Sequence, residues 1–180
     1  QRQMCIRDRP GWGARTFLAW RWRQPRVLVG KEPIMTATAD EAVFEADNVF
    51  GKGEPNTAYA QFFTGNSYLR SLVTDPDCVV GVANVTFEPG CRNNWHIHHA
   101  TSGGGQVLIC TVGSGWYQEE GKAPVSLEPG TVVFIRAGVK HWHGAKADSW
   151  FSHIALGVPG ENTSNEWLEP VDPAHYDALA

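Results

Sequence analysis

The chain has 180 residues, a net charge of −4 and an apolar fraction of 42%, which together fit one globular domain with a substantial core. The acidic balance gives no support to nucleic acid or an anionic membrane as a partner. Apolar runs stay well short of the roughly 18 residues that a membrane-spanning helix needs, so we expect no membrane partner. Eight Trp and 19 Gly favour a turn-rich β architecture over a helical bundle.

The first 34 residues differ from the rest of the chain. They contain eight of the 15 Lys and Arg residues but only two acidic residues, Asp8 and Glu32. The segment has no hydrophobic period of 2 or 3.6. We interpret residues 1–34 as a disordered or non-native N-terminal extension, such as translated upstream sequence. Its Arg-rich, acid-poor composition also resembles a transit peptide, and a functional basic arm is a further alternative.

Beyond this extension, the elements follow in a simple order. Residues 35–54 predict a short helical lead-in with Asp40 as its N-cap. From residue 55 to 170, short strands alternate with Gly/Pro turns, which is typical of a sandwich or barrel. The clearest strands span residues 79–87, 106–112, 116–119, 125–127, 131–135, 139–143 and 150–156. Residues 162–170 are interpreted as a polar loop anchored by Trp167, and residues 171–180 as a C-terminal helix capped by Asp172.

The four cysteines do not form a recognisable pattern. Cys5, Cys78, Cys91 and Cys110 have no CxxC pair and no regular spacing. They therefore predict neither a disulfide framework nor a zinc knuckle. Reduced thiols are typical of the cytosol, so we expect a cytoplasmic protein.

Three histidines carry the candidate chemistry. His96 and His98 are two residues apart, so in a strand both side chains lie on one face. Gln106 follows a glycine-rich turn, and a returning antiparallel strand can bring it beside the pair. His141 comes later, in a second His-x-His with His143. Imidazoles that converge from separate strands suit a first-row divalent metal, although hydrogen-bonded histidines in a barrel mouth are the alternative.

Other polar side chains could surround this centre. His143 shares a face with His141, and His153 lies mid-strand with a parity that could aim it inward. Both proton transfer and simple hydrogen-bonded burial stay open for these two histidines. A further group could recognise an anion or a ring at the rim, or could be solvated: Arg92, Lys140 and Trp142. We expect solvent-exposed positions for His99, Glu119, Glu120 and His175.

Two spaced motifs resemble those of the cupin family. The first runs from Gly90 through five residues to His96-Ile-His98, and from Gln106 through six residues to Gly113. The second runs from Gly130 through five residues to Arg136-Ala-Gly138 and then to His141. The chain departs from the family pattern in three places. Gln106 stands where Glu is usual, a longer loop of seven residues precedes it, and Arg136 replaces a proline.

The resemblance implies an all-β fold, a single-domain and jelly-roll-like antiparallel cupin β-barrel over residues 55–170, with short N- and C-terminal helices. It implies a metal centre whose ligands are His96, His98, Gln106 and His141. Mn or Fe(II) is favoured, and Zn, Ni or Co would also suit a set of three nitrogens and one oxygen without a thiolate. A homodimer or higher homo-oligomer that acts on a small-molecule substrate is also implied.

Within the family, the pattern is similar to bacterial metal-dependent hydroxynitrile lyases and to cupins associated with carboxymuconolactone decarboxylases. The first hypothesis is therefore a non-oxidative lyase or isomerase acting on a small oxygenated carbon substrate. Under it, the resemblance implies that His153 serves as a base, and His143 is a second candidate catalytic residue. The alternatives are an O2-dependent dioxygenase of the quercetinase type and a non-catalytic ligand-binding or sensory cupin.

Overall fold

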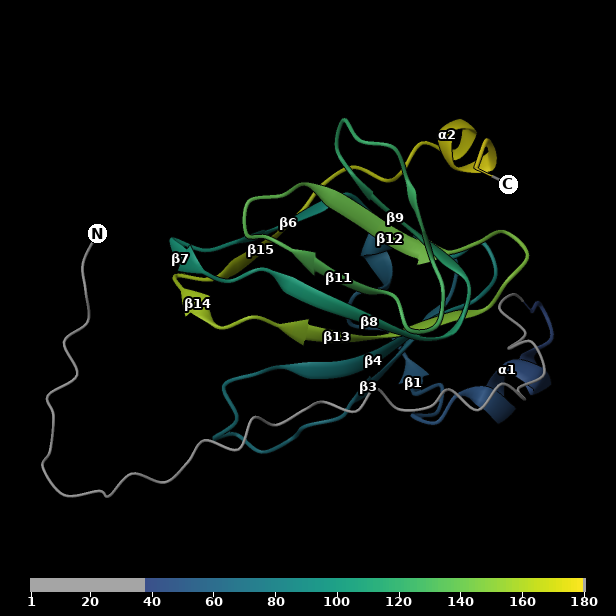
Figure 1. Ribbon diagram of the computed structural model, residues 1–180, viewed down its shortest axis with the longest axis horizontal. Coiled ribbons are helices and arrows are strands. Elements are labelled where there is room, and N and C mark those ends of the chain that lie inside the picture. The colour runs from purple at the N-terminus through teal and green to yellow at the C-terminus, as the bar shows by residue number, and fades with distance from the viewer. Residues whose placement is uncertain (1–37, 180) are drawn as a thin grey trace, which may run out of the picture. The chain divides into compact units, whose positions relative to one another are not determined.

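Two antiparallel sheets make up most of the described chain (Figure 1). The structure is a computed structural model that describes residues 38–179, and the predicted extension over residues 1–34 lies outside this range. Within this range, the strands pair with antiparallel neighbours. The all-β architecture expected from the strand and turn pattern is therefore confirmed.

The strand order explains how distant segments meet. The first sheet runs in the order β1 (Glu54–Pro55), β3 (Ser67–Ser71), β4 (Val82–Phe87), β13 (Phe151–Gly157), β8 (Gln106–Gly113) and β11 (Val132–Ile135). The second runs in the order β10 (Val125–Leu127), β9 (Gly115–Glu119), β12 (His141–Ala145), β5 (Arg92–Asn93) and β2 (Phe63–Thr64), and it also contains β6 (His96–His99) and β15 (Ser164–Trp167). In this second sheet β6 pairs with both β12 and β15.

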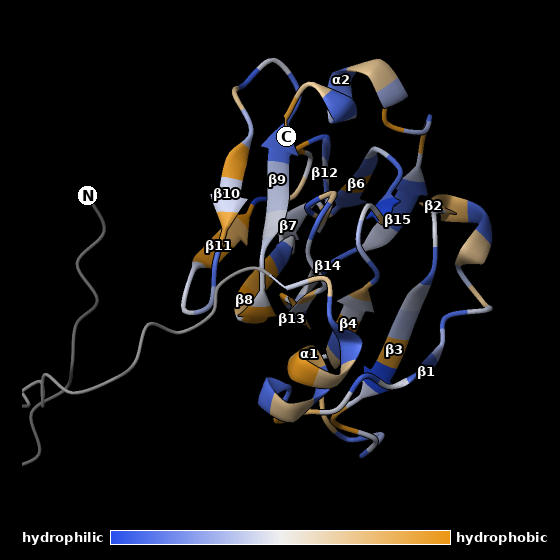
Figure 2. Ribbon diagram, turned by 90° about the vertical axis from the view of Figure 1, so that its right-hand side faces the viewer, coloured by the Kyte–Doolittle hydropathy of each residue, from blue (hydrophilic) through white to orange (hydrophobic). Residues whose placement is uncertain are grey.

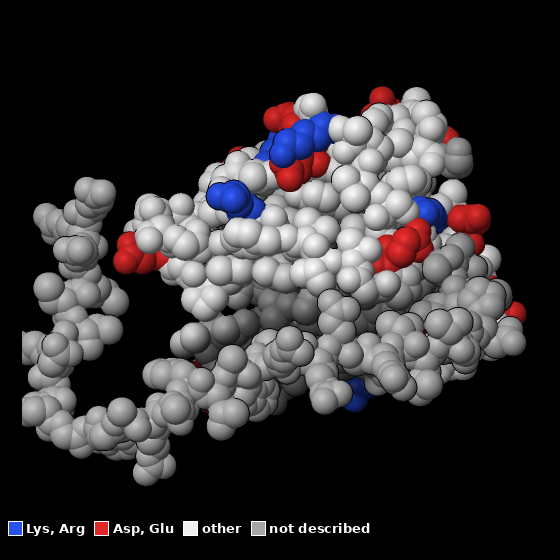
Figure 3. Space-filling view, in the orientation of Figure 1, with Lys and Arg blue, Asp and Glu red and all other residues white. Residues whose placement is uncertain are grey.

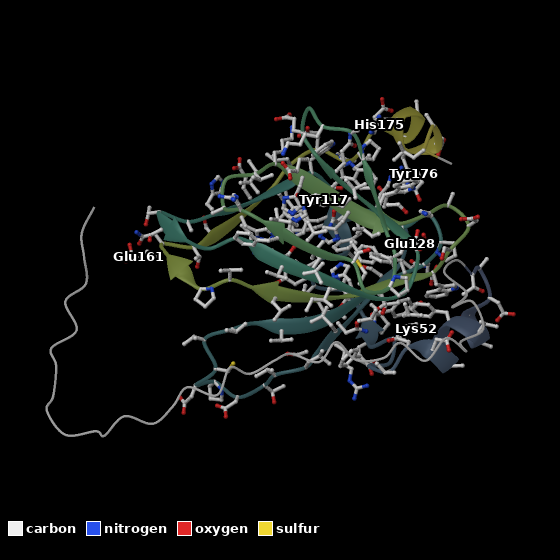
Figure 4. All side chains as sticks on the ribbon, in the orientation of Figure 1. Lys52, Tyr117, Glu128, Glu161, His175 and Tyr176 are labelled. Carbon is white, nitrogen blue, oxygen red and sulfur yellow. The ribbon has the colours of Figure 1, made fainter. Side chains whose placement is uncertain are left out.

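The core lies between the two sheets. Side chains of alternate residues on both sheets fill it, because successive residues of a strand point to opposite faces. Its buried members are Val85, Phe87, Cys91, Leu108, Cys110, Tyr117, Leu127, Ile135, Ala145 and Phe151. Figure 4 shows Tyr117 among them, in the space between the sheets. Cys91 and Cys110 thus pack as small apolar residues.

Short helices close the two ends of the described chain. The helix α1 (Glu41–Asp47) begins at Asp40, whose side chain accepts hydrogen bonds from the backbone N–H groups of Ala42 and Val43 at 2.9 and 3.2 Å. The helix α2 (Pro173–Asp177) begins at Asp172. A single 3-10 turn, η1 (Ala60–Phe62), leads into β2. The predicted cap residues are confirmed, although both helices are shorter than the segments assigned to them. In the described range, helices as long and apolar as a membrane crossing requires are absent.

The polar loop predicted over residues 162–170 is wrong in part. Residues Ser164–Trp167 form β15, which pairs with β6 in the register Asn165 to His98 and Trp167 to His96. The segment has no apolar alternation, and three of its four residues are polar and exposed. It becomes a strand because β6 offers it an unpaired edge, and such pairing is set by tertiary context.

The longer loop before Gln106 folds outward. Part of it forms β7 (Ser102–Gly103), which pairs with β14 (Gly160–Glu161) in a separate two-stranded ribbon. Figure 4 labels Glu161 at the tip of this ribbon. Gly105, which ends the loop, has a φ of 94°, and a Cβ there would collide with the Ile135 carbonyl. This glycine lets the chain turn sharply back into β8 with Gln106 as its first residue.

Candidate metal centre

Three histidine side chains meet on the second sheet. His96 and His98 lie on β6, and His141 opens β12, where it pairs directly with His96. One ring nitrogen of each histidine lies within 4.8 Å of those of the other two. The ring centres of His96 and His141 are 4.1 Å apart, and those of His98 and His141 are 5.4 Å apart. The expected convergence is present, and ligation of a metal stays a prediction.

A carbonyl oxygen holds the Nδ1 atom of each of these rings. The acceptors are the Asn94 backbone oxygen for His96 at 2.9 Å, the Val139 backbone oxygen for His141 at 2.9 Å and the side-chain Oδ1 of Asn165 for His98 at 2.7 Å. An acceptor beside Nδ1 favours the tautomer in which Nδ1 carries the proton. The Nε2 lone pair is then free, which is how metal-binding histidines are oriented.

Three buried acceptors in this place lack a hydrogen-bond partner among the described residues. They are Nε2 of His98, Nε2 of His141 and Oε1 of Gln106. Gln106 begins β8, so it reaches the histidines from the first sheet, and it lines the same inner cavity as His96 and His98. Buried polar atoms without partners are rare because they are costly. Their donor chemistry, nitrogen and oxygen without sulfur, fits a divalent metal ion.

Burial keeps these imidazoles neutral. It lowers the pKa of His141 to about 4, and burial is also the main reason that the pKa of His98 is lowered. The pKa of His96 lies well below its usual range because of burial and, secondly, because of the nearby His141. A histidine must be neutral to bind a metal, so all three are ready to do so at neutral pH.

A second histidine pair lies beside this group. The ring of His143, on β12, is centred 5.6 Å from that of His96. Its Nδ1 is 3.3 Å from Nε2 of His153, which lies on β13. Asn93 secures His143, because its Oδ1 accepts from the His143 backbone N–H at 3.0 Å and its Nδ2 lies 3.1 Å from the ring Nε2. Burial lowers the pKa of His153 to about 4 and that of His143 well below its usual range.

The two histidine groups share an inner cavity of about 190 Å³. His96, His98, His143, His153 and Gln106 line one part of it, and the remaining wall is mostly apolar or aromatic, formed by Tyr59, Phe63, Leu69, Ala83, Val85, Ala155 and Trp167. An outer cleft of about 610 Å³ adjoins it, and His98, Gln106 and Asn165 line both. The candidate ligands His98 and Gln106 therefore lie where the cleft and the cavity adjoin.

The sequence patterns missed three residues of this site. Asn165 and Trp167 come from β15, and Asn93 comes from the two-residue strand β5. The Trp167 ring stacks on His96 with ring centres 4.7 Å apart. Trp167 is a large aromatic residue in a polar segment, which predicted that it anchors the segment. The pattern did not show which residues Trp167 contacts. Asparagines carry no comparable signal, because they are common in ordinary turns.

Two residues expected at the rim lie elsewhere. Trp142 is fully buried against Val171 and Tyr176, on the face of β12 opposite His141. The guanidinium of Arg92 is also buried, 4.0 Å from the centre of the Tyr176 ring. Tyr176 belongs to α2, the helix that covers this face (Figure 4). The interpretation of both residues as rim residues is wrong, because the docking of α2 could not be inferred from their position in the sequence.

The other side chains expected near the surface behave differently from one another. Lys140 lies at the surface, where its Nζ is 2.9 Å from Glu120 and 2.6 Å from Glu169. Glu119 is partly covered and accepts a hydrogen bond from the Tyr117 hydroxyl at 3.1 Å. The ring of His175 is also partly covered, with Nε2 2.7 Å from Oε1 of Gln118. None of these residues belongs to the group of converging histidines.

Comparison with known proteins decides the family. No family model matches the chain. The chain is 41% identical over 118 residues to a protein named (R)-mandelonitrile lyase from Granulicella tundricola, and this match covers 65% of the chain and 87% of that protein. A cupin-like protein from Thermotoga maritima is 39% identical, with a TM-score of 0.63, over 73% of this chain and 96% of that one. The chain belongs to the cupin family.

Weaker similarity extends to other members. A cupin 2 conserved barrel domain protein from Rhodopseudomonas palustris is 16% identical, covers 70% of this chain and 80% of its own length, and superposes with a TM-score of 0.52. This match supports the cupin fold alone. The resemblance read from the two motifs is thus confirmed, and the centre built by His96, His98, His141 and Gln106 is the place where this cupin could hold a divalent metal.

Proposed function

We propose that this cupin is a metal-dependent lyase that cleaves a cyanohydrin into a carbonyl compound and hydrogen cyanide. One observation carries the proposal: a set of unpartnered metal donors shares a small cavity with a buried, neutral histidine pair. The similarity to a protein named (R)-mandelonitrile lyase supports this class of reaction. It is the reaction expected of the first sequence hypothesis.

The donor set would supply the electrophilic part of the reaction. Mn or Fe(II) held by the three histidines and Gln106 would act as a Lewis acid that makes the substrate hydroxyl more acidic, and Zn, Ni or Co could substitute. Because all four ligands are uncharged, the full charge of the metal would be available for this purpose. A non-oxidative cleavage needs no change in the oxidation state of the metal.

The histidine pair would move the proton. The imidazole of His153 takes the proton of the substrate hydroxyl, and Nδ1 of this ring is buried without a hydrogen-bond partner. As the carbonyl double bond forms, the bond from the carbon to the nitrile group breaks and its electron pair leaves with cyanide. Cyanide then receives the proton and departs as hydrogen cyanide. The contact of 3.3 Å with His143 lets that ring share the positive charge in the meantime.

The apolar wall of the inner cavity would hold the remainder of the substrate. Phe63, Leu69 and Val85 contribute aliphatic and aromatic surface opposite the histidines. Such a wall excludes water from the site, which strengthens electrostatic interactions there. The cavity of about 190 Å³ limits the substrate to a small molecule.

The test is to purify the protein without added metal, measure metal per subunit and assay cyanide release from a panel of cyanohydrins. We expect a transition metal at close to one ion per chain and cyanide release that continues without oxygen. His141→Ala should lose the metal, whereas His153→Ala should keep the metal and lose activity. Activity that requires oxygen would favour the dioxygenase hypothesis, and wild-type protein that binds no divalent metal would contradict the proposal.

A further inference from the structure

We infer that Asn165 on β15 is the positioning residue for His98, and thereby makes the metal centre depend on a strand far away in the sequence. The inference rests on the metal centre of the proposed function. It concerns how the ligand set is held in place, which that function does not specify. Two of the histidines are oriented by their own local backbone, whereas the third is oriented by this one distant side chain.

The local pair shows the contrast. His96 and His141 each point Nδ1 at the backbone oxygen of the residue two positions earlier, Asn94 and Val139, at 2.9 Å. A backbone oxygen is present whatever the side chain, so the strand conformation is enough to orient these two rings. His98 points Nδ1 at a side-chain oxygen of Asn165, 67 positions later in the chain, at 2.7 Å. The orientation of the His98 ring therefore depends on which residue occupies position 165.

Pairing with β6 holds β15 where Asn165 can contact His98. Asn165 is the direct cross-strand partner of His98, and Trp167 is that of His96. The Trp167 ring stacks on His96, with ring centres 4.7 Å apart. It also stacks on Phe62, with ring centres 4.7 Å apart and ring planes at 4° to each other. Because Asn165 and Trp167 are two residues apart, they share one face of β15, and each contacts the histidine opposite. Figure 1 shows β15 running alongside β6.

The location of His98 explains why it needs such a partner. His98 is only partly buried and lines both the inner cavity and the outer cleft, where water and ligands can reach it. Without the Asn165 oxygen, the proton of the imidazole could move to Nε2, or the ring could rotate into the cleft. Either change removes the Nε2 lone pair from the centre. Loss of a partner of this kind typically weakens metal binding by about 10–100-fold.

The same two strands provide a matched control. His99 follows His98, and its Nε2 lies 2.7 Å from Oε2 of Glu166, which follows Asn165. This contact also joins β6 to β15 through a histidine and a side-chain oxygen, but His99 is outside the group of converging histidines. Removing the His99–Glu166 contact shows whether metal binding depends on side-chain contacts between these strands in general or on the contact to His98 in particular.

The experiment compares Mn(II) affinity, measured by competition with a chromophoric chelator, in Asn165→Ala, Asn165→Asp and Glu166→Ala. We expect Asn165→Ala to bind Mn(II) about 10–100-fold more weakly, and Asn165→Asp, which keeps the acceptor oxygen, to bind about as well as the wild type. Glu166→Ala should bind like the wild type. In the metal-free wild type, ¹⁵N spectra of the imidazoles should show His98 protonated at Nδ1, and Asn165→Ala should lose this preference.

Several results would overturn the inference. Asn165→Ala could retain its Mn(II) affinity within about twofold, the two Ala variants could weaken binding equally, or His98 in the metal-free wild type could carry its proton on Nε2. His141→Ala separates this failure from that of the proposed function. If His141→Ala loses Mn(II) while Asn165→Ala does not, only the role of Asn165 is wrong, and if neither variant loses Mn(II), the metal centre itself is wrong.

Discussion

Gln106 is the residue in which this centre departs from the usual cupin pattern. Its amide oxygen is neutral, so a divalent metal held with three neutral imidazoles would keep its charge of +2. A Glu at the same place would lower that charge by one unit. One unit charge at about 4 Å is worth on the order of 4 kcal/mol at an effective dielectric of 20. The amide should therefore make the metal a stronger Lewis acid.

This reasoning predicts opposite effects for two substitutions at position 106. Gln106→Glu should bind metal at least as tightly as the wild type, because an anionic ligand holds a cation better, yet the proposed lyase activity should fall tenfold or more. Gln106→Ala should bind metal more weakly, since it removes the oxygen. Metal per subunit, measured by mass spectrometry, tests both variants. Unchanged metal content in Gln106→Ala would show that Gln106 is not a ligand.

The buried histidines also predict a pH dependence of stability. The pKa of His153 is about 4 in the folded protein against an ordinary value of 6.5, because burial disfavours its charged form. Above pH 6.5 the histidine is neutral in both states and costs nothing. Between pH 6.5 and 4 the unfolded chain takes up a proton that the folded chain does not, so stability is lost as the pH falls. The loss is up to about 1.4 kcal/mol per pH unit for each such histidine.

Urea unfolding of the metal-free protein, repeated from pH 7.5 to 4.5, measures this effect. We expect the free energy of unfolding to be level above pH 6.5 and to fall below it. In His153→Gln the fall should be less steep, because one titrating group is gone. An identical slope in the variant would show that His153 is not held neutral by the fold.

At the scale of elements, the candidate centre draws on four strands: β6 and β12 carry the histidines, β8 carries Gln106, and β15 carries residues that contact the rings. β6 supplies two histidines and β12 supplies the third, and their direct pairing brings His96 opposite His141. β15 closes the other side of β6. Asn165 of β15 orients the His98 ring, and Trp167 covers the His96 ring.

Removing the anchor of β15 should therefore loosen this strand. Trp167→Ala deletes a partly buried ring that stacks on both Phe62 and His96, and we expect a loss of about 2 kcal/mol in the free energy of unfolding. Amide hydrogen exchange in β15 should become faster. Trp116→Ala is the control, because Trp116 packs in the cluster around Trp142 and Tyr176 instead. Equal protection of β15 in both variants would contradict a role for Trp167 as its anchor.

At the scale of the whole molecule, a strip of exposed apolar side chains lies on β8 and β11 of the described residues. Ile109 on β8 pairs with Val132 on the edge strand β11, and these residues are 37% and 62% exposed. Phe134, two residues further along β11, is 54% exposed. Figure 2 shows the hydrophobic colour along β8, β10 and β11, and Figure 3 shows an uncharged band across the face over β8 and β11. An exposed edge with apolar side chains is a common surface for self-association.

We propose that a second copy of the chain covers this strip and forms the homodimer expected from the sequence. Sedimentation at micromolar concentration should give about twice the chain mass of 19.8 kDa. Phe134→Glu places a charge in the strip and should shift the protein toward monomer. Val49→Glu, at a still more exposed apolar position next to α1, should leave the dimer intact. A wild type that sediments as a monomer would contradict the proposal.

Much of the fold could be read from the sequence, because the signals are local. The apolar runs and the caps at Asp40 and Asp172 act within a few residues, and the strands expected over residues 106–112, 116–119, 125–127, 131–135 and 150–156 lie within one residue of β8, β9, β10, β11 and β13. The His-x-His spacing placed two candidate ligands on one face because side chains alternate along a strand. The two motifs then identified the family, although Gln106 follows an unusually long loop.

Tertiary structure decided what those local patterns could not. Residues 164–167 carry no strand signal, and they form β15 because β6 leaves an edge for them. Trp142 is buried because α2 docks over it, and Asn165 reaches His98 because the register of two strands aligns them. The sequence by itself therefore determined which residues could bind a metal and in which strands they lie. Which distant side chains hold those residues depends on pairing across many positions, and such pairing is chosen by the packing of the whole domain and not by any local preference.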